Sequence, residues 1–246
     1  MIRINHIYNE RVENFLPKMP DNMVDMVIAD PPFNLKKQYE DYEDDMPIEE
    51  YYGWVENWVR ASVQKLKNHG TLWVYCPTKH LGRFQVIGQK YGIWQNTVVW
   101  FYSNPTPSQK RLPKTWSAWL VFSKTDNFQF FKDAETVKSF QTGKPANVYD
   151  VWYDISKLTG GYLAQKEVIL KPGTKKREAV YQLPVRLLSR IIKLCSKEGD
   201  LILDLFSHSG TASYTADFLK RKYIAVEQSP YYCAIIKKRM DEIRLL

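Results

Sequence analysis

The sequence has few of the residues from which disulfide frameworks and metal centres are built. Its three cysteines, Cys76, Cys195 and Cys233, are scattered without C-x-x-C spacing, and its four histidines show no metal-ligand spacing. These patterns predict neither a disulfide scaffold nor a metal site. We expect Cys76 and Cys195 to be small buried hydrophobic residues in a reducing compartment.

Long hydrophobic runs are also absent. No segment approaches the roughly 20 apolar residues that a transmembrane helix needs, and the first residues, MIRINHIYNE, lack the pattern of a signal peptide. No internal repeat or low-complexity tract is present. The sequence therefore predicts a cytoplasmic protein without a membrane segment, whose 246 residues form one domain with a substantial core.

Positive charge and aromatic rings are plentiful by comparison. Lysine and arginine number 35 against 27 aspartates and glutamates, so the formal net charge is +8, and aromatic residues make up 14% of the chain. A basic excess favours a polyanionic partner such as a nucleic acid, although excess charge also serves solubility.

Segments typical of strands and helices alternate along most of the chain. The sequence predicts strands at 24–30, 71–76, 201–206 and 223–227, and helices from Pro47 to a stop at Gly70, in the eighties, from Pro184 to Gly199, at 209–222 and at 230–243. Residues 96–102 and 117–123 are typical of a hairpin. This order predicts an α/β fold with a mostly parallel twisted sheet, an antiparallel hairpin at one edge and helices on both faces.

The segment from Asp204 to Glu227 has the layout of an adenosine-binding βαβ unit. A buried strand ends at DLFSHSGT, a helix follows, and the next strand ends in Glu227, whose carboxylate can accept hydrogen bonds from ribose hydroxyls. The loop keeps only Gly210, with His208 at an earlier glycine position, which favours a ligand with adenosine but no pyrophosphate. The alternative is a tight strand-to-helix turn with a solvated glutamate.

The segment VIADPPFN ends a buried strand with a carboxylate, two prolines and an aromatic ring. Asp30 and the carbonyl of Pro31, which the diproline fixes in direction, can both accept hydrogen bonds from an adenine amine and draw it toward tetrahedral geometry. Phe33 can stack on a base that has left the duplex. The alternative is a strand terminator with a solvated aspartate. At one edge of a sheet, this segment and the adenosine unit would place a methyl donor opposite a base.

These motifs resemble those of the S-adenosylmethionine-dependent DNA amino-methyltransferases, over nearly the whole chain. ADPPFN resembles the catalytic tetrapeptide of that family, LDLFSHSGT its cofactor loop, and AVEQSPYYCAIIKKR its acidic strand and following helix. The catalytic motif precedes the cofactor motif, as in the permuted β class. The resemblance implies a Rossmann-like class I methyltransferase fold in a single domain, 1–246, with a small target-recognition insertion at about 124–180.

The resemblance also implies roles for individual residues. The implied catalytic group is Asp30, Pro31, Pro32 and Phe33, and an aspartate at its first position usually accompanies adenine. The implied cofactor residues are Asp204, Phe206, Ser207, His208, Ser209, Gly210, Thr211, Glu227 and Gln228. Three positions depart from the family pattern: Leu183 replaces a lysine before Pro184, Arg11 stands where an aspartate is usual, with Asn9 and Glu10 as substitutes, and His208 replaces a glycine.

Further side chains could contact DNA or have ordinary structural roles. The following can bind phosphates or simply be solvated: Lys110, Arg111, Lys114, Lys175, Lys176 and Arg177. Five tryptophans are expected in the core more than in base stacking: Trp94, Trp100, Trp116, Trp119 and Trp152. The acidic segment 40–45 is either a lid over a flipped base or a solvated loop.

The sequence therefore predicts an enzyme that flips adenine out of double-stranded DNA and transfers a methyl group to its exocyclic amine from S-adenosylmethionine. Methylation of the cytosine amine, or of structured RNA, is the alternative within this class. Two alternatives belong to other functional classes. One is a nucleotide-dependent oxidoreductase, which would leave DPPF and the basic excess unexplained, and the other is a catalytically silent DNA-binding homologue. The family resemblance also implies a homodimer and a paired restriction endonuclease, for which the sequence shows no pattern.

Overall fold

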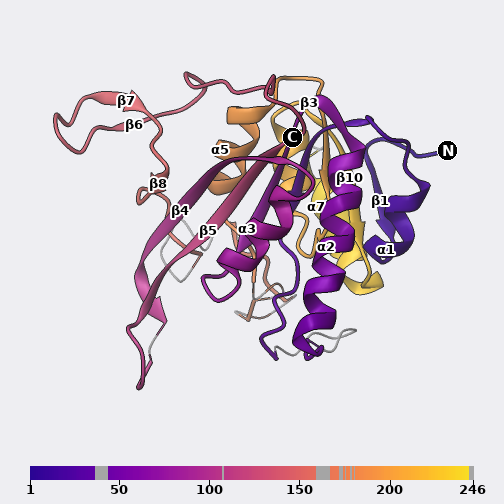
Figure 1. The fold of residues 1–246 in the computed structure, drawn as a ribbon, viewed down its shortest axis with the longest axis horizontal. Coiled ribbons are helices and arrows are strands. Elements are labelled where there is room, and N and C mark those ends of the chain that lie inside the picture. Colours follow the sequence, from indigo (N-terminus) through magenta and orange to yellow (C-terminus); the bar gives the residue numbers. More distant parts are fainter. Residues whose placement is uncertain are drawn as a thin grey trace.

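The computed structural model describes residues 1–36, 44–106, 108–158, 167–171, 174, 176–177, 179 and 181–243. Within them, eight strands form one sheet in the order β1-β10-β9-β2-β3-β5-β4-β8 (Figure 1). The strands are β1 (His6–Asn9), β2 (Val24–Ala29), β3 (Leu66–Cys76), β4 (Ile93–Thr106), β5 (Lys114–Ser123), β8 (Val151–Trp152), β9 (Leu201–Asp204) and β10 (Lys222–Glu227). Of these strands, β5 runs antiparallel to both its neighbours, and the other pairings are parallel.

Two groups of helices cover the two faces of the sheet. One face carries α1 (Val12–Phe15), the 3₁₀ turn η1 (Leu16–Lys18), α2 (Ile48–Lys65) and α3 (Leu81–Gln89). The other face carries α5 (Val185–Cys195), α6 (Thr211–Phe218) and α7 (Pro230–Ile243). This arrangement confirms the predicted α/β fold with a mostly parallel sheet.

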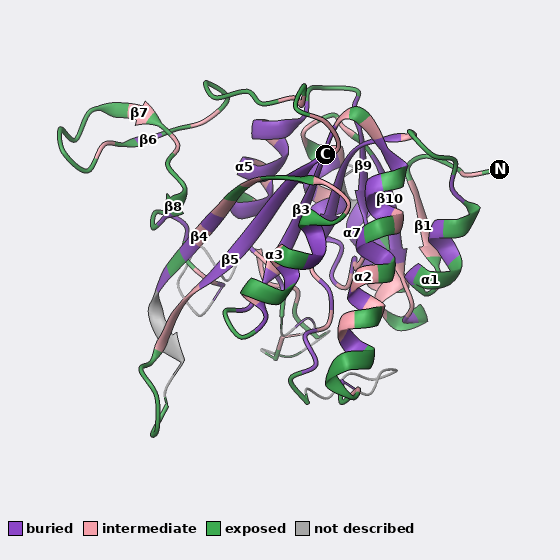
Figure 2. Ribbon diagram, viewed as in Figure 1, coloured by how far each residue is buried: buried purple, intermediate pink, exposed green. Residues whose placement is uncertain are grey.

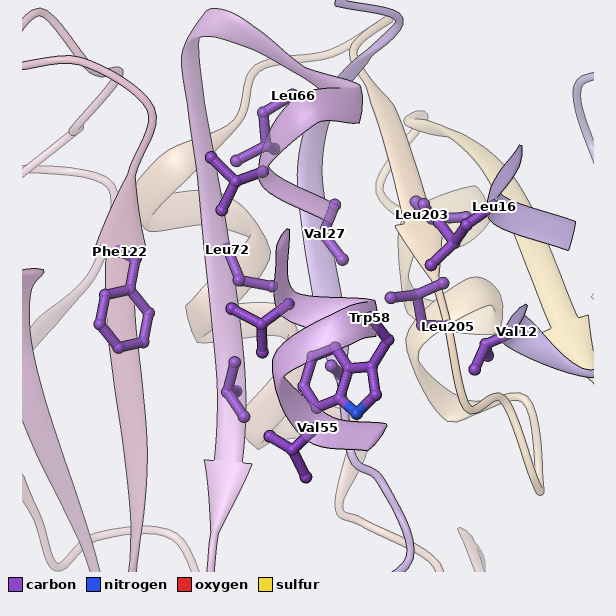
Figure 3. Close-up of a cluster of buried hydrophobic side chains, with 14 of the residues drawn as sticks. Val12, Leu16, Val27, Val55, Trp58, Leu66, Leu72, Phe122, Leu203 and Leu205 are labelled. Carbon is purple, nitrogen blue, oxygen red and sulfur yellow. The ribbon is translucent and has the colours of Figure 1, made fainter. Parts of the chain in front are cut away.

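Alternating residues of the central strands supply the two cores. Val27 belongs to the cluster under α2, whereas its neighbour Ile28 belongs to the cluster under α5 and α6. Figure 3 shows Val55 and Trp58 of α2 lying against Val27 and the adjacent strands. The central strands are buried over most of their length (Figure 2), because helices cover both of their faces.

The strands β2 and β9 are neighbours in the sheet, but the chain leaves them toward opposite faces. Ile28 pairs with Asp204, and the amide of Leu205 donates to the carbonyl of Ile28 at 3.1 Å. After β2 the chain continues to α2, and after β9 it continues to α6 on the other face. Ligands of open α/β sheets bind at such switch points, outside the carboxyl ends of the strands.

The start of β3 differs from the sequence prediction. Helix α2 ends at Lys65, and β3 begins at Leu66, whereas we expected the helix to continue to Gly70. The pairing with β2 shifts register here, so residues 67–70 form a bulge. A Cβ atom at Gly70 would lie 3.0 Å from the carbonyl oxygen of Asp25. Gly70 therefore permits a close approach of two backbones in a bulge and does not end the helix.

The predicted hairpin is formed by β4 and β5, which lie toward one edge of the sheet. The two-residue strand β8, from the segment 124–180, pairs outside β4 and is the outermost strand on that side. Two other short strands, β6 (Thr136–Lys138) and β7 (Pro145–Asn147), form a separate ribbon that projects from the body (Figure 1). None of the described helices is both long enough and apolar enough to cross a membrane.

Candidate active site

A cavity of about 640 Å³ lies at the carboxyl ends of the parallel strands. It is lined by the whole predicted catalytic group, Asp30, Pro31, Pro32 and Phe33. It is also lined by four of the predicted cofactor residues, Phe206, His208, Glu227 and Gln228. Two motifs from opposite ends of the sequence therefore share one cavity, which is the arrangement needed to bring two ligands together.

The tetrapeptide directly after β2 is fixed through its backbone. The hydroxyl of Tyr51, on the buried side of α2, donates to the carbonyl of Pro32 at 2.9 Å. Pro31 is buried, and no described residue donates a hydrogen bond to its carbonyl oxygen. The neighbouring carbonyl is thus held by the protein, while that of Pro31 has acceptor capacity left for a ligand.

The fully buried side chain of His80 holds the last residue of the tetrapeptide. Its Nε2 donates to the carbonyl oxygen of Phe33 at 2.8 Å, and its Nδ1 accepts from the hydroxyl of Tyr52 at 2.9 Å. Burial lowers the pKa of His80, which keeps the imidazole neutral, and the acceptor at Phe33 places its proton on Nε2. The ring therefore has the protonation and orientation that both bonds require.

Aromatic side chains line the part of the cavity beside the tetrapeptide. Phe33 is 7% exposed, and its ring meets that of Tyr75 edge-on, with centroids 5.8 Å apart. The ring of Tyr75 packs in turn against that of Trp119, with centroids 5.1 Å apart. Burial, and then the negative charge of Asp30, raise the pKa of Tyr75, so its hydroxyl keeps its proton. This part of the cavity has the flat, apolar surfaces on which a base can stack.

Asn34 and Asp44 close the loop that follows the tetrapeptide. The amides of Asn34 and Leu35 donate to the two carboxylate oxygens of Asp44 at 2.7 and 2.9 Å. The side-chain amide of Asn34 bridges the N–H and carbonyl of Met46, and its backbone is left-handed, with φ of 51°. Asp44, within the expected lid at 40–45, is thus a buried anchor. Residues 40–43 of that lid lie outside the described residues.

Glu227 ends β10 with its carboxylate held by two backbone amides. Its Oε2 accepts from the N–H of His208 at 2.7 Å, and its Oε1 accepts from the N–H of Ser229 at 2.9 Å. Burial raises the pKa of Glu227, and these hydrogen bonds oppose the rise. A carboxylate has about four acceptor positions, so both oxygens can still accept hydrogen bonds from hydroxyl groups of a ligand.

The other predicted cofactor residues are buried beneath the cavity and shape its loop: Asp204, Ser207, Ser209, Gly210 and Thr211. Asp204 accepts from the backbone N–H and the hydroxyl of Ser213 at 3.1 and 2.8 Å. Burial raises the pKa of Asp204 to about 6, against the effect of these bonds. Its carboxylate fixes the first turn of α6 to the end of β9.

The loop has two residues in the left-handed backbone region. His208 has φ of 44°, as the sequence interpretation allowed, and its ring packs against Tyr232 at 4.3 Å. Gly210 has φ of 70°, and a Cβ atom there would lie 2.8 Å from the side chain of Ile236. Gly210 is therefore required by its backbone conformation and by its contact with α7.

The predicted phosphate-binding residues are divided between the cavity and the surface. Lys114 and Arg177 line the cavity. Three others are exposed, namely Lys110, Arg111 and Lys176, and Lys175 lies outside the described residues. Lys157, which the sequence did not single out, also lines the cavity, with its Nζ 3.4 Å from the ring centroid of Tyr102. Of the five tryptophans expected in the core, Trp100, Trp119 and Trp152 are buried, whereas Trp94 is 40% exposed.

The positions that depart from the family pattern lie at the cofactor end. Arg11 and Leu183 both line the cavity, and Arg11 pairs with Glu13 at 3.7 Å. Asn9 donates to the backbone carbonyls at the end of β10 at 3.0 and 2.7 Å, which holds that strand end in place. Glu10 lines the cavity and pairs with a lysine of η1.

Three residues that support the site were not identified from the sequence: Tyr51, His80 and Arg239. The guanidinium of Arg239 is buried and donates to the carbonyl of Ser209 and to the hydroxyl of Thr211, both at 3.0 Å. An arginine on the same helical stripe as Ile236 and Met240 was the available signal, because a buried cation requires partners. Among the described residues, no group of three or more histidines, cysteines and acids could hold a metal ion.

Solved methyltransferase structures share this fold. A structure described as PvuII DNA methyltransferase (cytosine-N4-specific) matches with a TM-score of 0.72 at 21% identity, covering 96% of this chain and 86% of that one. A complex of M1.HpyAVI with S-adenosylmethionine matches with a TM-score of 0.67 at 18% identity, covering 96% and 98%. These similarities confirm the class I methyltransferase fold.

Sequence relatives include several type II methyltransferases. M.HpaI of Haemophilus parainfluenzae is 27% identical over 234 residues, which are 92% of this chain and 71% of the relative. M2.MboI of Moraxella bovis is 27% identical over 261 residues (97% and 88%), and M.BamHI of Bacillus amyloliquefaciens is 28% identical over 256 residues (96% and 57%). The family model described as DNA methylase matches residues 24–238, which include both motifs of the cavity. The chain therefore belongs to the N6/N4 DNA methylase family.

Proposed function

We propose that this DNA methylase transfers a methyl group from S-adenosylmethionine to the exocyclic amine of adenine in double-stranded DNA, after the base has been flipped out of the helix. The observation that carries the proposal is the shared cavity of Asp30–Phe33 and Glu227. Asp30 at the first position of the tetrapeptide supports adenine, because the family resemblance associates aspartate there with that base.

The cofactor end of the cavity suits an adenosine-containing ligand. Glu227 has acceptor capacity for the ribose hydroxyls. The rings of Phe206 and Trp54 meet edge-on, with centroids 5.7 Å apart. Both side chains line the cavity and provide aromatic surface for a purine. S-adenosylmethionine, when bound, supplies an electrophilic methyl group on a positively charged sulfur. The loop at Gly210, held from below by Arg239 and Asp204, keeps this end of the cavity in shape.

The tetrapeptide activates the base. The carboxylate of Asp30 and the carbonyl of Pro31 accept hydrogen bonds from the two N–H groups of the amine, which draws the nitrogen toward tetrahedral geometry and frees its lone pair. A hydrogen bond to an ionised acceptor contributes on the order of 1.5–3 kcal/mol. Asp30 also provides an acceptor for the proton that the amine loses on methylation. Phe33 stacks on the base, and Tyr51 and His80 prevent the peptide from shifting.

The DNA contacts come from the basic residues and from the insertion. Lys114 and Arg177 lie where phosphates beside the flipped nucleotide would pass, and Lys110 and Arg111 extend this positive surface along the hairpin. Residues 124–180 recognise the target sequence. The type II names of the relatives support pairing with a restriction endonuclease, and the enzyme acts in the cytoplasm, as a homodimer.

The test is transfer of labelled methyl from S-adenosylmethionine to duplex DNA, followed by digestion to nucleosides. We expect N6-methyladenine. N4-methylcytosine would assign the cytosine amine instead, an outcome kept open by the description of the PvuII structure. Asp30→Asn, whose amide oxygen is a weaker acceptor and cannot take up the proton, should lower transfer strongly and leave cofactor binding, measured by calorimetry, unchanged. Glu198→Gln, a carboxylate-to-amide change at an exposed residue before β9, is the matched control. Undiminished transfer by Asp30→Asn would contradict the assignment.

A further inference from the structure

The tip of the β4–β5 hairpin, residues 108–113, exposes an aliphatic side chain. Leu112 is 93% exposed, and among the described residues only Met1 exceeds it as an exposed large hydrophobic side chain. Figure 1 shows the hairpin projecting beyond the rest of the sheet, and Figure 2 shows that its tip is exposed. At this exposure almost all of the apolar area of Leu112 is in contact with water, which is unfavourable.

The tip lies at the edge of the sheet that carries the cavity. Because β5 runs antiparallel to β3, its first residues lie beside the carboxyl end of β3, with Ala118 opposite Cys76. Lys114, the first residue of β5, lines the cavity. Leu112 is two residues before it, a separation of at most about 7 Å of extended chain. A ligand that extends out of the cavity past Lys114 therefore comes within reach of Leu112.

Positively charged residues flank this leucine in the sequence. Lys110 and Arg111 precede it and are exposed, and Lys114 follows it. The backbone is stiffened by Pro113, whose ring fixes φ and disfavours the helical region for Leu112. Cations on both sides of one exposed aliphatic side chain suit a DNA duplex, in which phosphates flank a stack of apolar base faces.

We propose that Leu112 is a wedge that enters the base stack of the duplex at the position vacated by the flipped base. This inference rests on the proposed function. Flipping leaves a gap that exposes the faces of the two adjacent base pairs, and an apolar side chain inserted there removes those faces and itself from water. Lys110, Arg111 and Lys114 hold the hairpin on the backbone, while the wedge stabilises the flipped state.

The test compares two synthetic duplexes, made after the methylated site has been located in treated DNA. One has the target base normally paired, and the other has an abasic site opposite it, so that flipping breaks no base pair. On the paired duplex, Leu112→Ala should lower kcat/KM about 10- to 100-fold, as expected when a flipped state loses its support. On the abasic duplex, its kcat/KM should be within about twofold of that of the unaltered protein.

Controls separate the wedge from other roles. Ile4→Ala removes another exposed aliphatic side chain, before β1 at the opposite edge of the sheet, and should leave both rates unchanged. Leu112→Phe should retain most of the activity on the paired duplex. Equal losses by Leu112→Ala on both duplexes, or no loss on either, would overturn the wedge while leaving the proposed function intact. Failure of the unaltered protein to methylate any DNA would overturn both.

Discussion

The Nε2 atom of His80 lies 2.8 Å from the carbonyl oxygen of Phe33, although the two residues are 47 positions apart in the sequence. The bond joins the segment after β3 to the catalytic tetrapeptide after β2. Since the ring is buried and neutral, and Tyr52 donates to its other nitrogen, the imidazole can donate only toward Phe33. His80 is therefore a positioning residue, which holds the catalytic tetrapeptide in place without taking part in the chemical step.

Replacing His80 should impair turnover more than binding. In His80→Ala the carbonyl of Phe33 loses its donor, and we expect kcat to fall about 10- to 100-fold, because small displacements of reacting groups have effects of that order. The KM for DNA and the Kd for the cofactor should change little. His80→Gln, whose amide can reach the same carbonyl, should restore much of kcat. Equal activity of the two variants would contradict this role, and steady-state kinetics with a calorimetric Kd will decide it.

The sequence predicted most of the fold because its signals were local. The alternation of apolar strands and amphipathic helices, with proline at helix starts, identifies α2, α5 and α7 and the parallel strands between the helices. The bulge at residues 67–70 was missed because a glycine after a helical pattern usually marks a helix end. Here Gly70 is needed by a contact with β2, which the local sequence does not reveal.

The sequence predicted the two motifs that line the cavity, but not the residues that hold these motifs in place. Asp30 follows β2 and Glu227 ends β10, and the carboxyl ends of these two strands had to share an edge once the sheet was parallel. The roles of His80, Arg239 and Asp44 depend on which loop packs against which, and that follows from strand order. In the strand order β9-β2-β3-β5-β4, strands that are far apart in the sequence, such as β9 and β2, are neighbours in the sheet. Local residue patterns identify the strands but do not determine this order.

Asp204 should make stability depend on pH. Burial raises its pKa from an ordinary value of 3.8 to about 6, so between these values the folded protein binds a proton that the unfolded chain does not. The contribution of Asp204 to the free energy of unfolding is therefore fully present below about pH 4. It is lost as the pH rises to about 6, and the loss is on the order of 3 kcal/mol. In Asp204→Asn this loss is absent, so its free energy of unfolding should rise relative to the unaltered protein by that order between pH 4 and 7.

Urea denaturation at pH 4, 5, 6 and 7 measures the effect of Asp204→Asn, with Glu198→Gln as the control at an exposed carboxyl group. A constant difference between Asp204→Asn and the unaltered protein across this range would show that the carboxyl group is not protonated more readily in the folded state.

Gly210→Ala should destabilise the cofactor loop. The new methyl group would lie 2.8 Å from the side chain of Ile236, and the backbone there has φ of 70°. Left-handed strain and overpacking each cost about 1–3 kcal/mol, so we expect a loss of that order in the free energy of unfolding and weaker binding of S-adenosylmethionine.

Adding Ile236→Ala to Gly210→Ala separates the two causes, because it removes the clash but not the backbone strain. We expect the double variant to bind the cofactor better than Gly210→Ala alone. If cofactor binding remains as weak in the double variant, the effect belongs to the backbone. Calorimetric titration and urea denaturation of the unaltered protein, Gly210→Ala, Ile236→Ala and the double variant measure both quantities.

The predicted recognition insertion is attached to the core through Arg190 and Asp154. Arg190, on α5, is 1% exposed, and its guanidinium donates to both carboxylate oxygens of Asp154 at 2.8 and 2.6 Å and lies over the ring of Trp152. The hydrogen bonds from Arg190 lower the pKa of Asp154, so the pair is ionised at neutral pH. Asp154→Asn would leave the buried cation with only the more distant carboxylate of Glu135, 4.0 Å from its Nε, whereas Arg190→Met removes the cation itself.

We therefore expect Asp154→Asn to lower the free energy of unfolding by about 3–5 kcal/mol, and Arg190→Met to lower it by less, because an apolar side chain of similar length needs no partner. The segment around β8 should also become more accessible to protease in Asp154→Asn. Glu49→Gln, which weakens an exposed pair with Arg83, is the matched control and should change stability by less than about 1 kcal/mol. A larger loss in Arg190→Met than in Asp154→Asn would mean that the packing of the arginine on Trp152, and not its charge, holds the insertion in place.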